Sequence, residues 1–383
     1  MNEPAQDARV RDAVDRQEAL RALSPEIEQA RRVPASLAAE LAQAGHYRML
    51  VPASLGGGEV HPRVFVDVLR ALGRGDGATA WTVMTGATTG LLSAYLPREG
   101  ATELFSDPAS VPAGVFAPMG RAIPVDGGYR FGGRWPFTSG VENASVRLGG
   151  GLVFEGDKPR LLPSGGPEIR SFFVRADQSL VIDTWKTSGL RGTGSHDMVV
   201  EDIFVPDSHT ACVFTNAPTE SGPLYRFPLF GLLALGVSAV GLGIARASLD
   251  ELGELATRKK RGRRSLAETE LAQLRMAEAE GELRAAEALI GATIDDVWTG
   301  EGALDARDRA SLRLAATHAA RVAARVVDAA YHLGGGASIY ESSPLQRHFR
   351  DVHTMTQHIM VNEISLKPVG RVLFGLPTDL AQL

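Results

Sequence analysis

Apolar residues at helical spacing dominate the first hundred residues of the chain. In SLAAELAQAGHYRML, residues 36–50, Leu37, Leu41 and Ala44 fall on one stripe, and Gly45 ends the turn. The next stretch, VPASLGGGEV, predicts a loop because three successive glycines lose too much entropy inside a helix or strand. The pattern therefore predicts a helical domain over residues 1–112.

Short segments of continuous or alternating apolar residues replace this pattern from about residue 113. They are GYRFGGRWPF, SVRLGGGLVF, RSFFVRA, LVIDTWK and DMVVEDIFVP, and Gly, Pro and Asp turns separate them. Several short strands at this spacing indicate a small β-barrel or sandwich. We assign this part to residues 113–215.

Helical spacing returns after the linker-like TNAPTESGPL and predicts a bundle over residues 223–383. In residues 311–333 one stripe recurs every three or four positions and is rich in alanine, which allows close helix packing. Its members are Leu312, Ala316, Ala319, Ala323, Val326, Ala330 and Leu333. The basic run RKKRGRRS, residues 258–265, predicts a solvated turn between two long helices, with phosphate binding as the less favoured alternative.

Composition narrows the classes of protein that the chain can belong to. Its 383 residues are 44% hydrophobic and 22% charged with a net charge of -5, so no basic excess points to nucleic acid or an anionic membrane. A single cysteine, Cys212, excludes an intramolecular disulfide framework and a cysteine-rich metal site. The N-terminus lacks the apolar segment of a signal peptide. We expect a cytoplasmic protein without a metal.

Three stretches place Gly, Ser and Thr beside aromatic residues. They are GRWPFTSG (133–140), WKTSGLRGTGS (185–195) and YHLGGGASIYESSPLQRHFRD (331–351). Taken singly, each is most simply a tight turn. GLRGTGS leads into a strand-like segment instead of a helix, so it is not a dinucleotide-binding glycine motif, and it does not match GxxxxGK[ST].

Taken together and in this order, these stretches carry a family resemblance. With GDGATAW at residues 75–81, and with GLRGTGSHD running into VEDIFVP, the chain resembles the acyl-CoA dehydrogenase superfamily from end to end. It is most similar to the branch of two-component, group D flavin monooxygenases that use reduced flavin from a separate reductase. The resemblance implies an α+β, mainly α fold: an N-terminal helical domain, a central β-barrel and a C-terminal four-helix bundle.

The resemblance also implies positions around a flavin. Thr138 and Ser139 would lie near the reactive N5/C4a region, and Thr193 and Ser195 would offer hydroxyls to the flavin or its phosphate. Trp135 and Trp185 are candidate walls for the ring, with a buried tryptophan in the barrel core as the alternative. Gly334, Gly335 and Gly336 would reach the phosphate or adenosine end of a neighbouring subunit's flavin in a homotetramer, and a cation from residues 258–261 would meet the phosphate.

The resemblance locates the catalytic base at two places in the dehydrogenase branch. One falls about nine residues after Arg350, where the chain has Gln357, His358, Ile359 and Met360; the other falls on the first bundle helix, which has no acid before Asp250. The missing carboxylate argues against α,β-dehydrogenation of a thioester. In the monooxygenase branch, the residue in the place of His358 is a catalytic base or a partner of the flavin hydroperoxide.

Helical spacing predicts Arg350, Thr354 and His358 on one helix face. We assign Arg350 and Asp351 to structural pairing and His348 and His353 to neighbouring faces without a role. An ordinary helix histidine is the alternative interpretation of His358.

The resemblance also bears on the substrate. Many aromatic hydroxylases of this branch carry a histidine seven or eight residues after the tryptophan at Trp81, where this chain has Thr88 and Thr89. This departure disfavours a simple phenol and favours an amine or a larger fused-ring compound. We predict substrate contacts from Trp81, Thr88 and Thr89.

The sequence therefore predicts a monooxygenase that uses reduced FMN or FAD and O2, through a C4a-hydroperoxyflavin, with His358 and Ser139 positioning the substrate. The alternatives are an FAD-dependent dehydrogenase with a non-standard base and a helical scaffold protein that has lost its flavin.

Overall fold

The N-terminal part of the chain is helical, as its apolar spacing predicts. The computed structural model describes residues 7–299, 304–380 and 383. The first helices are α1 (Ala8–Asp15), α2 (Gln17–Ala30), α3 (Ala35–Gln43), α4 (Pro62–Gly75), α5 (Gly77–Leu91) and α6 (Arg98–Phe105). Asp76 separates α4 from α5 because its backbone is extended and its carboxylate accepts from the Thr79 N–H at the start of α5.

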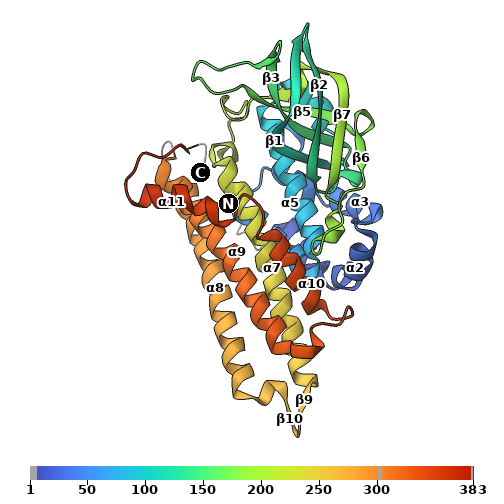
Figure 1. Ribbon diagram of the computed structural model, residues 1–383, viewed down its shortest axis with the longest axis vertical. Helices are drawn as coiled ribbons and strands as arrows, with labels where there is room; N and C mark the ends of the chain where they lie inside the picture. The colour runs from blue at the N-terminus through green and yellow to red at the C-terminus, as the bar shows by residue number, and fades with distance from the viewer. Residues whose placement is uncertain (1–6, 300–303, 381–382) are drawn as a thin grey trace.

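A strongly curved sheet follows the N-terminal helices and lies at one end of the molecule (Figure 1). Its strands are β1 (Pro112–Val125), β2 (Gly128–Thr138), β3 (Val146–Glu155), β4 (Lys158–Pro159), β5 (Ile169–Arg175), β6 (Leu180–Ile182), β7 (His196–Pro206) and β8 (Thr210–Ala211). Hydrogen-bonded order is β6-β7-β2-β1-β3-β5-β8, with β4 on β3. β1 pairs with β3 in parallel, and the remaining pairs are antiparallel. The sheet encloses its own apolar core, which includes Phe131, Trp135 and Phe172.

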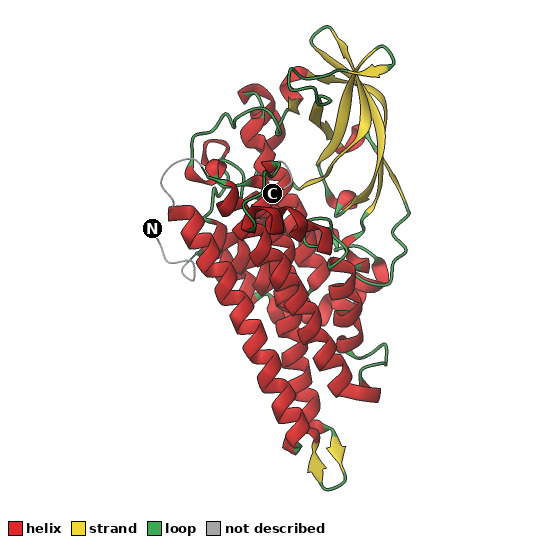
Figure 2. Cartoon of the chain, turned by 60° about the vertical axis from the view of Figure 1, so that its left-hand side comes forward, coloured by secondary structure: helices red, strands yellow, loops and turns green. Residues whose placement is uncertain are grey.

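The C-terminal part is a bundle of long helices. It consists of α7 (Leu229–Arg258), a hairpin of β9 (Lys260–Arg261) and β10 (Arg264–Ser265), α8 (Glu270–Thr299), α9 (Ala306–Gly334), α10 (Pro344–Met355) and α11 (Leu366–Leu373). The hairpin lies at the tip opposite the sheet (Figure 2). The predicted alanine-rich stripe of α9 is buried except for Leu333, which is partly buried.

Helix α7 runs through the middle of the helical part. Of the described residues, it is the helix long and apolar enough to cross a membrane, but 83% of its most apolar window is buried inside the protein. It packs so closely on α4 that a Cβ on Gly243 would lie 2.5 Å from the Arg70 carbonyl oxygen. A core helix of a folded bundle explains its composition.

One apolar core joins the two ends of the chain. It extends from Ala13 in α1 through α4, α5, α7 and α9 to Val361 after α10, and it includes Leu148 and Phe173 from the sheet. The N-terminal helices and the C-terminal bundle therefore share one interior, whereas the sheet has a second interior of its own.

Candidate active site

Four buried polar side chains from three segments form a continuous chain of hydrogen bonds. The Nε1–H of Trp81 on α5 donates to Ser139 Oγ over 3.0 Å. Ser139 Oγ lies 2.7 Å from Ser195 Oγ, and Ser195 Oγ lies 2.6 Å from Thr193 Oγ1. We call Trp81, Ser139, Ser195 and Thr193 the hydroxyl chain. It brings together four residues that the sequence places in the site, and it ends on the Leu190 carbonyl, which Thr193 reaches at 2.8 Å.

The loops that carry the hydroxyl chain have an uncommon backbone. Gly140 and Gly194 take φ values of +72° and +52°, and Phe137 and Leu190 take +64° and +48° without being glycine. Left-handed non-glycine residues persist where the surrounding structure holds them, and they concentrate at functional sites. The Gly140 N–H donates to the Thr193 carbonyl over 2.8 Å, which fixes the two loops together.

An aromatic pair lies beside these loops. Trp185 donates its Nε1–H to the Leu190 carbonyl over 2.9 Å, and its ring meets Phe137 edge to face at 6.0 Å between centroids. Phe137 is 67% exposed, whereas Trp185 is buried. The sequence indicated Trp185 but missed Phe137. The sequence signal for Phe137 is an aromatic residue at the end of a predicted strand, directly before the Thr-Ser-Gly turn.

The structure corrects the prediction for Trp135. Its side chain is fully buried in the sheet core, where Nε1–H donates to the Gly150 carbonyl over 2.8 Å and the ring packs against Phe131. It offers no face to a ligand, so the core interpretation holds. Residues two apart on a regular strand share a face, but the ladder of β2 with β7 is irregular between Trp135 and Thr138. Together with the left-handed backbone of Phe137, this break turns the Phe137 ring outward while Trp135 stays inside.

Three predicted threonine hydroxyls also point elsewhere. Thr138 is fully buried and donates to the Trp135 carbonyl over 3.1 Å. Thr88 and Thr89 are buried and donate to carbonyls of their own helix, those of Met84 and Thr85, over 2.9 and 2.8 Å. Back-bonding of this kind satisfies the hydroxyl within the helix. None of the three joins the hydroxyl chain.

His358 reaches the hydroxyl chain, but from a turn. Helix α10 ends at Met355, so the predicted common helix face with Arg350 and Thr354 is wrong. Residues 356–362 form a tight turn, which we call the His358 turn, in which the His358 carbonyl accepts from the N–H groups of Val361 and Asn362, both over 3.0 Å. The imidazole of His358 lies edge to face against Trp81, with 5.5 Å between centroids.

The protonation state of His358 follows from its surroundings. Burial, and to a smaller extent the nearby Arg313 cation, lowers the pKa of the imidazole to about 4. The ring is therefore neutral near pH 7. Its Nδ1 accepts from the Met360 N–H over 3.3 Å, so the proton of the neutral ring sits on Nε2. In this state the Nε2–H is a hydrogen-bond donor.

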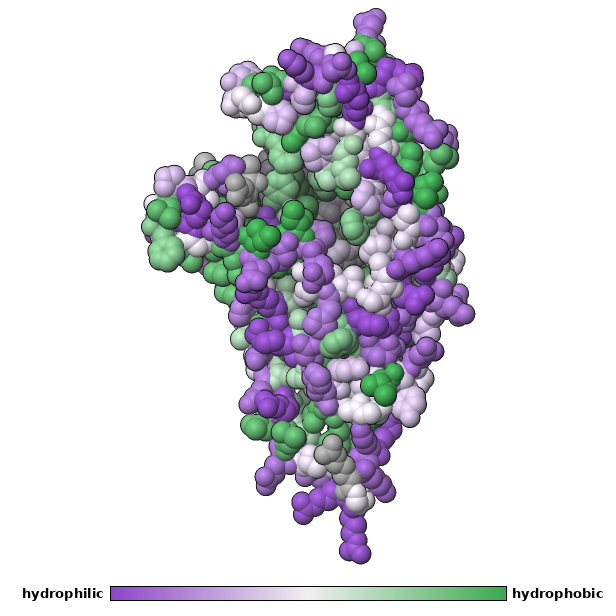
Figure 3. All heavy atoms as spheres, viewed as in Figure 1, coloured by the Kyte–Doolittle hydropathy of each residue, from purple (hydrophilic) through white to green (hydrophobic). Residues whose placement is uncertain are grey.

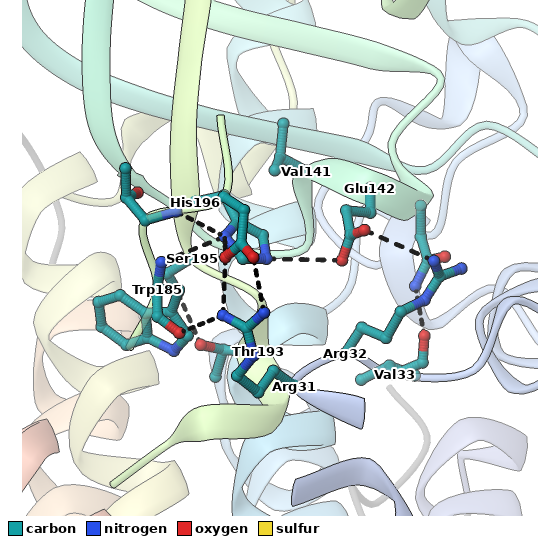
Figure 4. Close-up of polar contacts among 12 residues, drawn as sticks. Arg31, Arg32, Val33, Val141, Glu142, Trp185, Thr193, Ser195 and His196 are labelled. Atoms are coloured by element: carbon teal, nitrogen blue, oxygen red, sulfur yellow. Dashed lines mark hydrogen bonds and ion pairs between the residues drawn. The ribbon is translucent and has the colours of Figure 1, made fainter. Parts of the chain in front are cut away.

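The end of α2 clamps the loop that carries Trp185 (Figure 4). Arg31, at φ +54°, pairs with both carboxylate oxygens of Asp183 over 2.7 and 2.8 Å and donates to the Trp185 carbonyl over 3.0 Å. His196 Nδ1 accepts from the Trp185 N–H over 3.2 Å, and its Nε2 lies 3.7 Å from Glu142. No sequence motif indicated the contacts of Arg31, which join segments 152 and 154 residues apart.

Helix α10 fixes the same loop from the other side. The Asp351 carboxylate accepts from the Leu190 N–H over 2.5 Å, and Arg350 pairs with Glu28 over 2.6 Å and donates to the Ser188 carbonyl. Burial raises the pKa of Asp351 to about 7, while the Leu190 N–H and Arg347 act to lower it. Arg350 and Asp351 therefore hold the loop that ends the hydroxyl chain.

The two remaining histidines of α10 have partners of their own. His348 Nδ1 lies 3.1 Å from Ser248 Oγ, and burial lowers the pKa of this imidazole to about 3. His353 Nε2 lies 2.8 Å from Asp328. Both contacts are within the bundle, away from the hydroxyl chain.

The three-glycine segment and the basic run meet at the tip of the bundle. Lys259 Nζ donates to the Gly334 carbonyl over 2.6 Å, and a Cβ on Gly335 would lie 3.6 Å from the same Nζ. This tip, with β9 and β10, is at the opposite end of the molecule from the sheet (Figure 1). Gly334, Gly335 and Gly336 therefore do not join Ser139 within one chain.

The residues present fit a flavin. Hydroxyls, glycine turns and an exposed aromatic ring gather on adjoining loops, which is the combination that a flat ring with a polar edge requires. Arg191, between Leu190 and Thr193, has a buried Nε without a hydrogen-bond partner in the described part of the chain. Within the same described part, no cluster of three His, Cys, Asp or Glu side chains could hold a metal ion.

No carboxylate faces the candidate site from the two places where the resemblance implies a dehydrogenase base. The nearest acid after His358 is Glu363, whose side chain is 91% exposed and lies 3.9 Å from Arg321. Asp250, the first acid of α7, pairs with Arg74 over 2.6 Å. Both acids are therefore engaged outside the site.

Comparisons with known proteins identify the relatives of this chain. Residues 235–363 match the family described as acyl-CoA dehydrogenase, C-terminal domain. Over 340 residues the chain is 37% identical to indole-3-acetate monooxygenase of Pseudomonas putida, covering 86% of this chain and 84% of that protein. The crystal structure of 3-HSA hydroxylase from Rhodococcus sp. RHA1 superposes with a TM-score of 0.90 at 26% identity, covering 100% of both chains. XiaF from Streptomyces sp., in complex with FADH2 and glycerol, gives 0.85 at 27% identity, covering 96% of both chains.

Proposed function

The chain belongs to the flavin-dependent monooxygenases of the acyl-CoA dehydrogenase fold, and we propose that it hydroxylates an aromatic small molecule as the oxygenase component of a two-component system. A separate reductase supplies reduced FMN or FAD. One atom of O2 enters the product and the other leaves as water while the flavin is oxidised. When bound, the reduced flavin supplies the two electrons and the activated oxygen.

The observation that carries this proposal is the contact of His358 with the hydroxyl chain. A neutral imidazole with its proton on Nε2 stands where a dehydrogenase would need a carboxylate. A neutral donor can hold an oxygen atom by hydrogen bonding without removing an acidic proton from a thioester. Of the two roles that the resemblance implies for His358, catalytic base or partner of the flavin hydroperoxide, we propose the second, in which Nε2–H donates to the transferred oxygen or to the substrate.

The other site residues have positioning roles in this proposal. Trp81 fixes the Ser139 hydroxyl, and Ser195 and Thr193 orient it from the other side. Because Thr193 donates to the Leu190 carbonyl, Ser195 donates to Thr193 and Ser139 donates to Ser195. Ser139 Oγ is then left with an acceptor lone pair of fixed direction for an N–H at the flavin edge. The buried setting of these groups excludes water from the oxygen-transfer step.

The oligomer and the location of the protein are also part of the proposal. Large apolar side chains stand exposed near the C-terminus: Ile359, Ile364, Leu373 and Phe374 are 70%, 75%, 73% and 85% exposed. The face drawn in Figure 3 is also hollowed between the sheet and the region around α11, with apolar side chains on its walls. Such surfaces support burial by further copies of the chain. We propose a cytoplasmic homotetramer in which Lys259 and the three glycines serve a neighbour's flavin.

Rapid mixing tests the proposed function. Protein loaded anaerobically with reduced FMN or FAD is mixed with oxygenated buffer while the flavin spectrum is followed. A monooxygenase shows a long-lived species between the reduced and oxidised spectra, and Ser139→Ala shortens its lifetime by about tenfold, as loss of one hydrogen bond of about 1.4 kcal/mol implies. Immediate reoxidation, together with tight retention of oxidised FAD and bleaching by an acyl thioester, would support a dehydrogenase instead.

A further inference from the structure

Arg313 on α9 is a buried cation without an acidic partner. The residue is 4% exposed, and no carboxylate in the described ranges forms an ion pair with it. Its Nη1–H donates to the carbonyl oxygen of Met360 over 2.9 Å and lies 3.1 Å from the Met360 sulfur. Its Nε is buried without a partner. Burial lowers the pKa of Arg313 to about 10, which leaves the guanidinium charged near pH 7.

Two other buried arginines, Arg48 and Arg147, also have a buried Nε without a partner in the described chain, but both of their Nη atoms are hydrogen-bonded. Arg48 donates from both Nη atoms to the carbonyls of Phe105, Asp107 and Leu55. Arg147 likewise donates from both Nη atoms, to three carbonyls and the Ser179 hydroxyl. Arg313 differs because, among the residues that the structure describes, only its Nη1 has a partner. A charged guanidinium with an unused edge is expensive unless an anion completes it.

A single residue, Met360, links Arg313 to His358 by hydrogen bonds. Met360 donates its N–H to His358 Nδ1 and accepts Arg313 Nη1–H at its carbonyl. Met360 therefore brings the guanidinium of Arg313 close to the imidazole of His358. The positive charge of Arg313 helps to lower the pKa of this imidazole. One helical turn earlier on the same face of α9, Arg309 also has a buried Nε without a partner in the described chain.

We infer that Arg313 forms a subsite for the carboxylate of the substrate, so that the enzyme takes an aromatic compound with a short acidic side chain. This inference rests on the proposed function and adds the substrate's charge to it. The Nε and Nη2 edge of a guanidinium matches the two oxygens of a carboxylate. Indole-3-acetate, named for the 37% identical relative, has this combination of fused ring and carboxylate.

Direct binding tests the subsite separately from the reaction. Indole-3-acetate and its neutral counterpart indole-3-acetamide are titrated calorimetrically into the protein under anaerobic conditions, with and without reduced flavin. The wild-type protein should bind the acid at least about tenfold more tightly than the amide. Arg313→Gln should weaken binding of the acid by about 10–100-fold and change binding of the amide by less than about threefold, as loss of a charge-assisted bidentate contact implies.

Two further variants separate recognition from structure. Arg321→Gln removes one positive charge from an exposed position of the same helix and should leave both affinities unchanged. Arg313→Lys keeps the charge and should retain part of the preference for the acid, and thermal melting checks the fold of each variant. Equal weakening of acid and amide would show that Arg313 only holds the His358 turn, and equal binding of both by the wild-type protein would also overturn the subsite.

Failure of the carboxylate subsite and failure of the proposed monooxygenase function would give different results. A preference for the acid that depends on Arg313, combined with the absence of oxygen transfer from reduced flavin, would leave the anion subsite in place and refute the monooxygenase. Normal oxygen transfer to the amide, with no preference for the acid, would support the monooxygenase and refute the carboxylate subsite.

Discussion

Trp81 and His358 meet at nearly right angles, with ring centroids 5.5 Å apart and planes inclined by 76°. Trp81 belongs to α5 in the N-terminal helices, and His358 to the turn after α10. The same indole donates to Ser139, so one ring links the imidazole to the hydroxyl chain. The Met360 N–H occupies Nδ1 of this imidazole, so Nε2 is the nitrogen that can reach a ligand.

Substitutions at His358 should depend on which imidazole nitrogen they imitate. Nδ1 is occupied by the Met360 N–H, and Nε2 carries the free proton. The amide of glutamine can place an N–H near the position of Nε2, whereas the shorter asparagine reaches only the position of Nδ1. We expect His358→Gln to keep a substantial part of the product formed per reduced flavin oxidised, and His358→Asn to lose about tenfold or more, as removal of one well-placed donor implies.

The pH dependence provides the control for this experiment. Because the pKa of His358 lies near 4, the ring is neutral at both pH 6 and pH 8. Coupling by the wild-type enzyme should therefore show no inflection from His358 between these values. An inflection near pH 6.5 that disappears in His358→Gln would contradict the assigned protonation state.

Removal of the Arg31 clamp should weaken flavin binding more than folding. Arg31 holds Asp183 and the Trp185 carbonyl, but the ion pair is exposed to solvent, so it contributes little to the free energy of unfolding. Loss of the clamp frees the loop of Trp185. We expect Arg31→Ala to raise the dissociation constant of reduced flavin by about tenfold, equivalent to about 1.4 kcal/mol.

Arg32 offers a matched control for the clamp. Among the residues that the structure describes, its side chain forms an ion pair with Glu142 over 3.5 Å and none with Asp183. Arg32→Ala should leave the dissociation constant of reduced flavin within about twofold of wild type, in line with a weak surface pair. Equal effects of the two variants in an anaerobic flavin titration would refute the role given to Arg31.

Asp351 should make the protein less stable as the pH rises from about 4 to 7. The pKa of an ordinary aspartate is 3.8, whereas that of Asp351 in the folded protein is about 7. Between these two pH values the folded protein therefore holds a proton that the unfolded chain has released. The free energy of unfolding therefore falls with rising pH through this range and is unaffected by this group above pH 7. Asp351→Asn lacks the effect and can still accept the Leu190 N–H.

Denaturant unfolding at several pH values measures this contribution. Relative to wild type, Asp351→Asn should gain about 2–4 kcal/mol between pH 4.5 and 7.5. Asp295→Asn is the control, because Arg63 lowers the pKa of Asp295 and the sign of its small contribution is opposite. A constant difference between Asp351→Asn and wild type across this range would disprove the buried, protonated carboxyl.

Two helix glycines should respond to alanine with opposite signs. On Gly243 of α7 a methyl group would lie 2.5 Å from the Arg70 carbonyl oxygen and 2.8 Å from Gly73, so Gly243→Ala should destabilise by about 2–3 kcal/mol. On Gly281 of α8 the methyl group would meet nothing within 4 Å, and Gly281→Ala should stabilise by about 0.5–1 kcal/mol. Denaturant midpoints compare the two, and equal effects would contradict the close packing of α4 on α7.

The sequence predicted the order of helices and strands because periodicity is local. Five strand segments were identified from alternation or apolar runs, but β1 was missed, since PAGVFAPMGRAIPV contains three prolines. The structure accommodates them through shifts of register around Pro118. Such accommodation depends on the partner strand, which a single segment does not reveal.

Local motifs predicted several residues of the site but not the contacts between them. Ser139, Ser195, Thr193 and Trp81 were indicated by motifs, whereas their mutual hydrogen bonds depend on how three segments meet in space. The wrong helix face for His358 came from extending a period of 3.6 beyond Met355. Arg313 was not predicted, because an arginine outside the apolar stripe of a helix resembles an ordinary surface residue until its burial is known.

The shared interior of the N-terminal helices and the bundle has a consequence for synthesis of the protein on the ribosome. Helices α1 to α6 are complete at Phe105, but α7, against which α4 and α5 pack, ends at Arg258. At about 5–20 residues per second the intervening chain takes roughly 8–30 s to emerge. During that interval the nascent helices expose apolar surface that only later residues can cover, while the sheet between them can already close on its own core. The need for chaperones during translation is therefore concentrated in the first third of the chain.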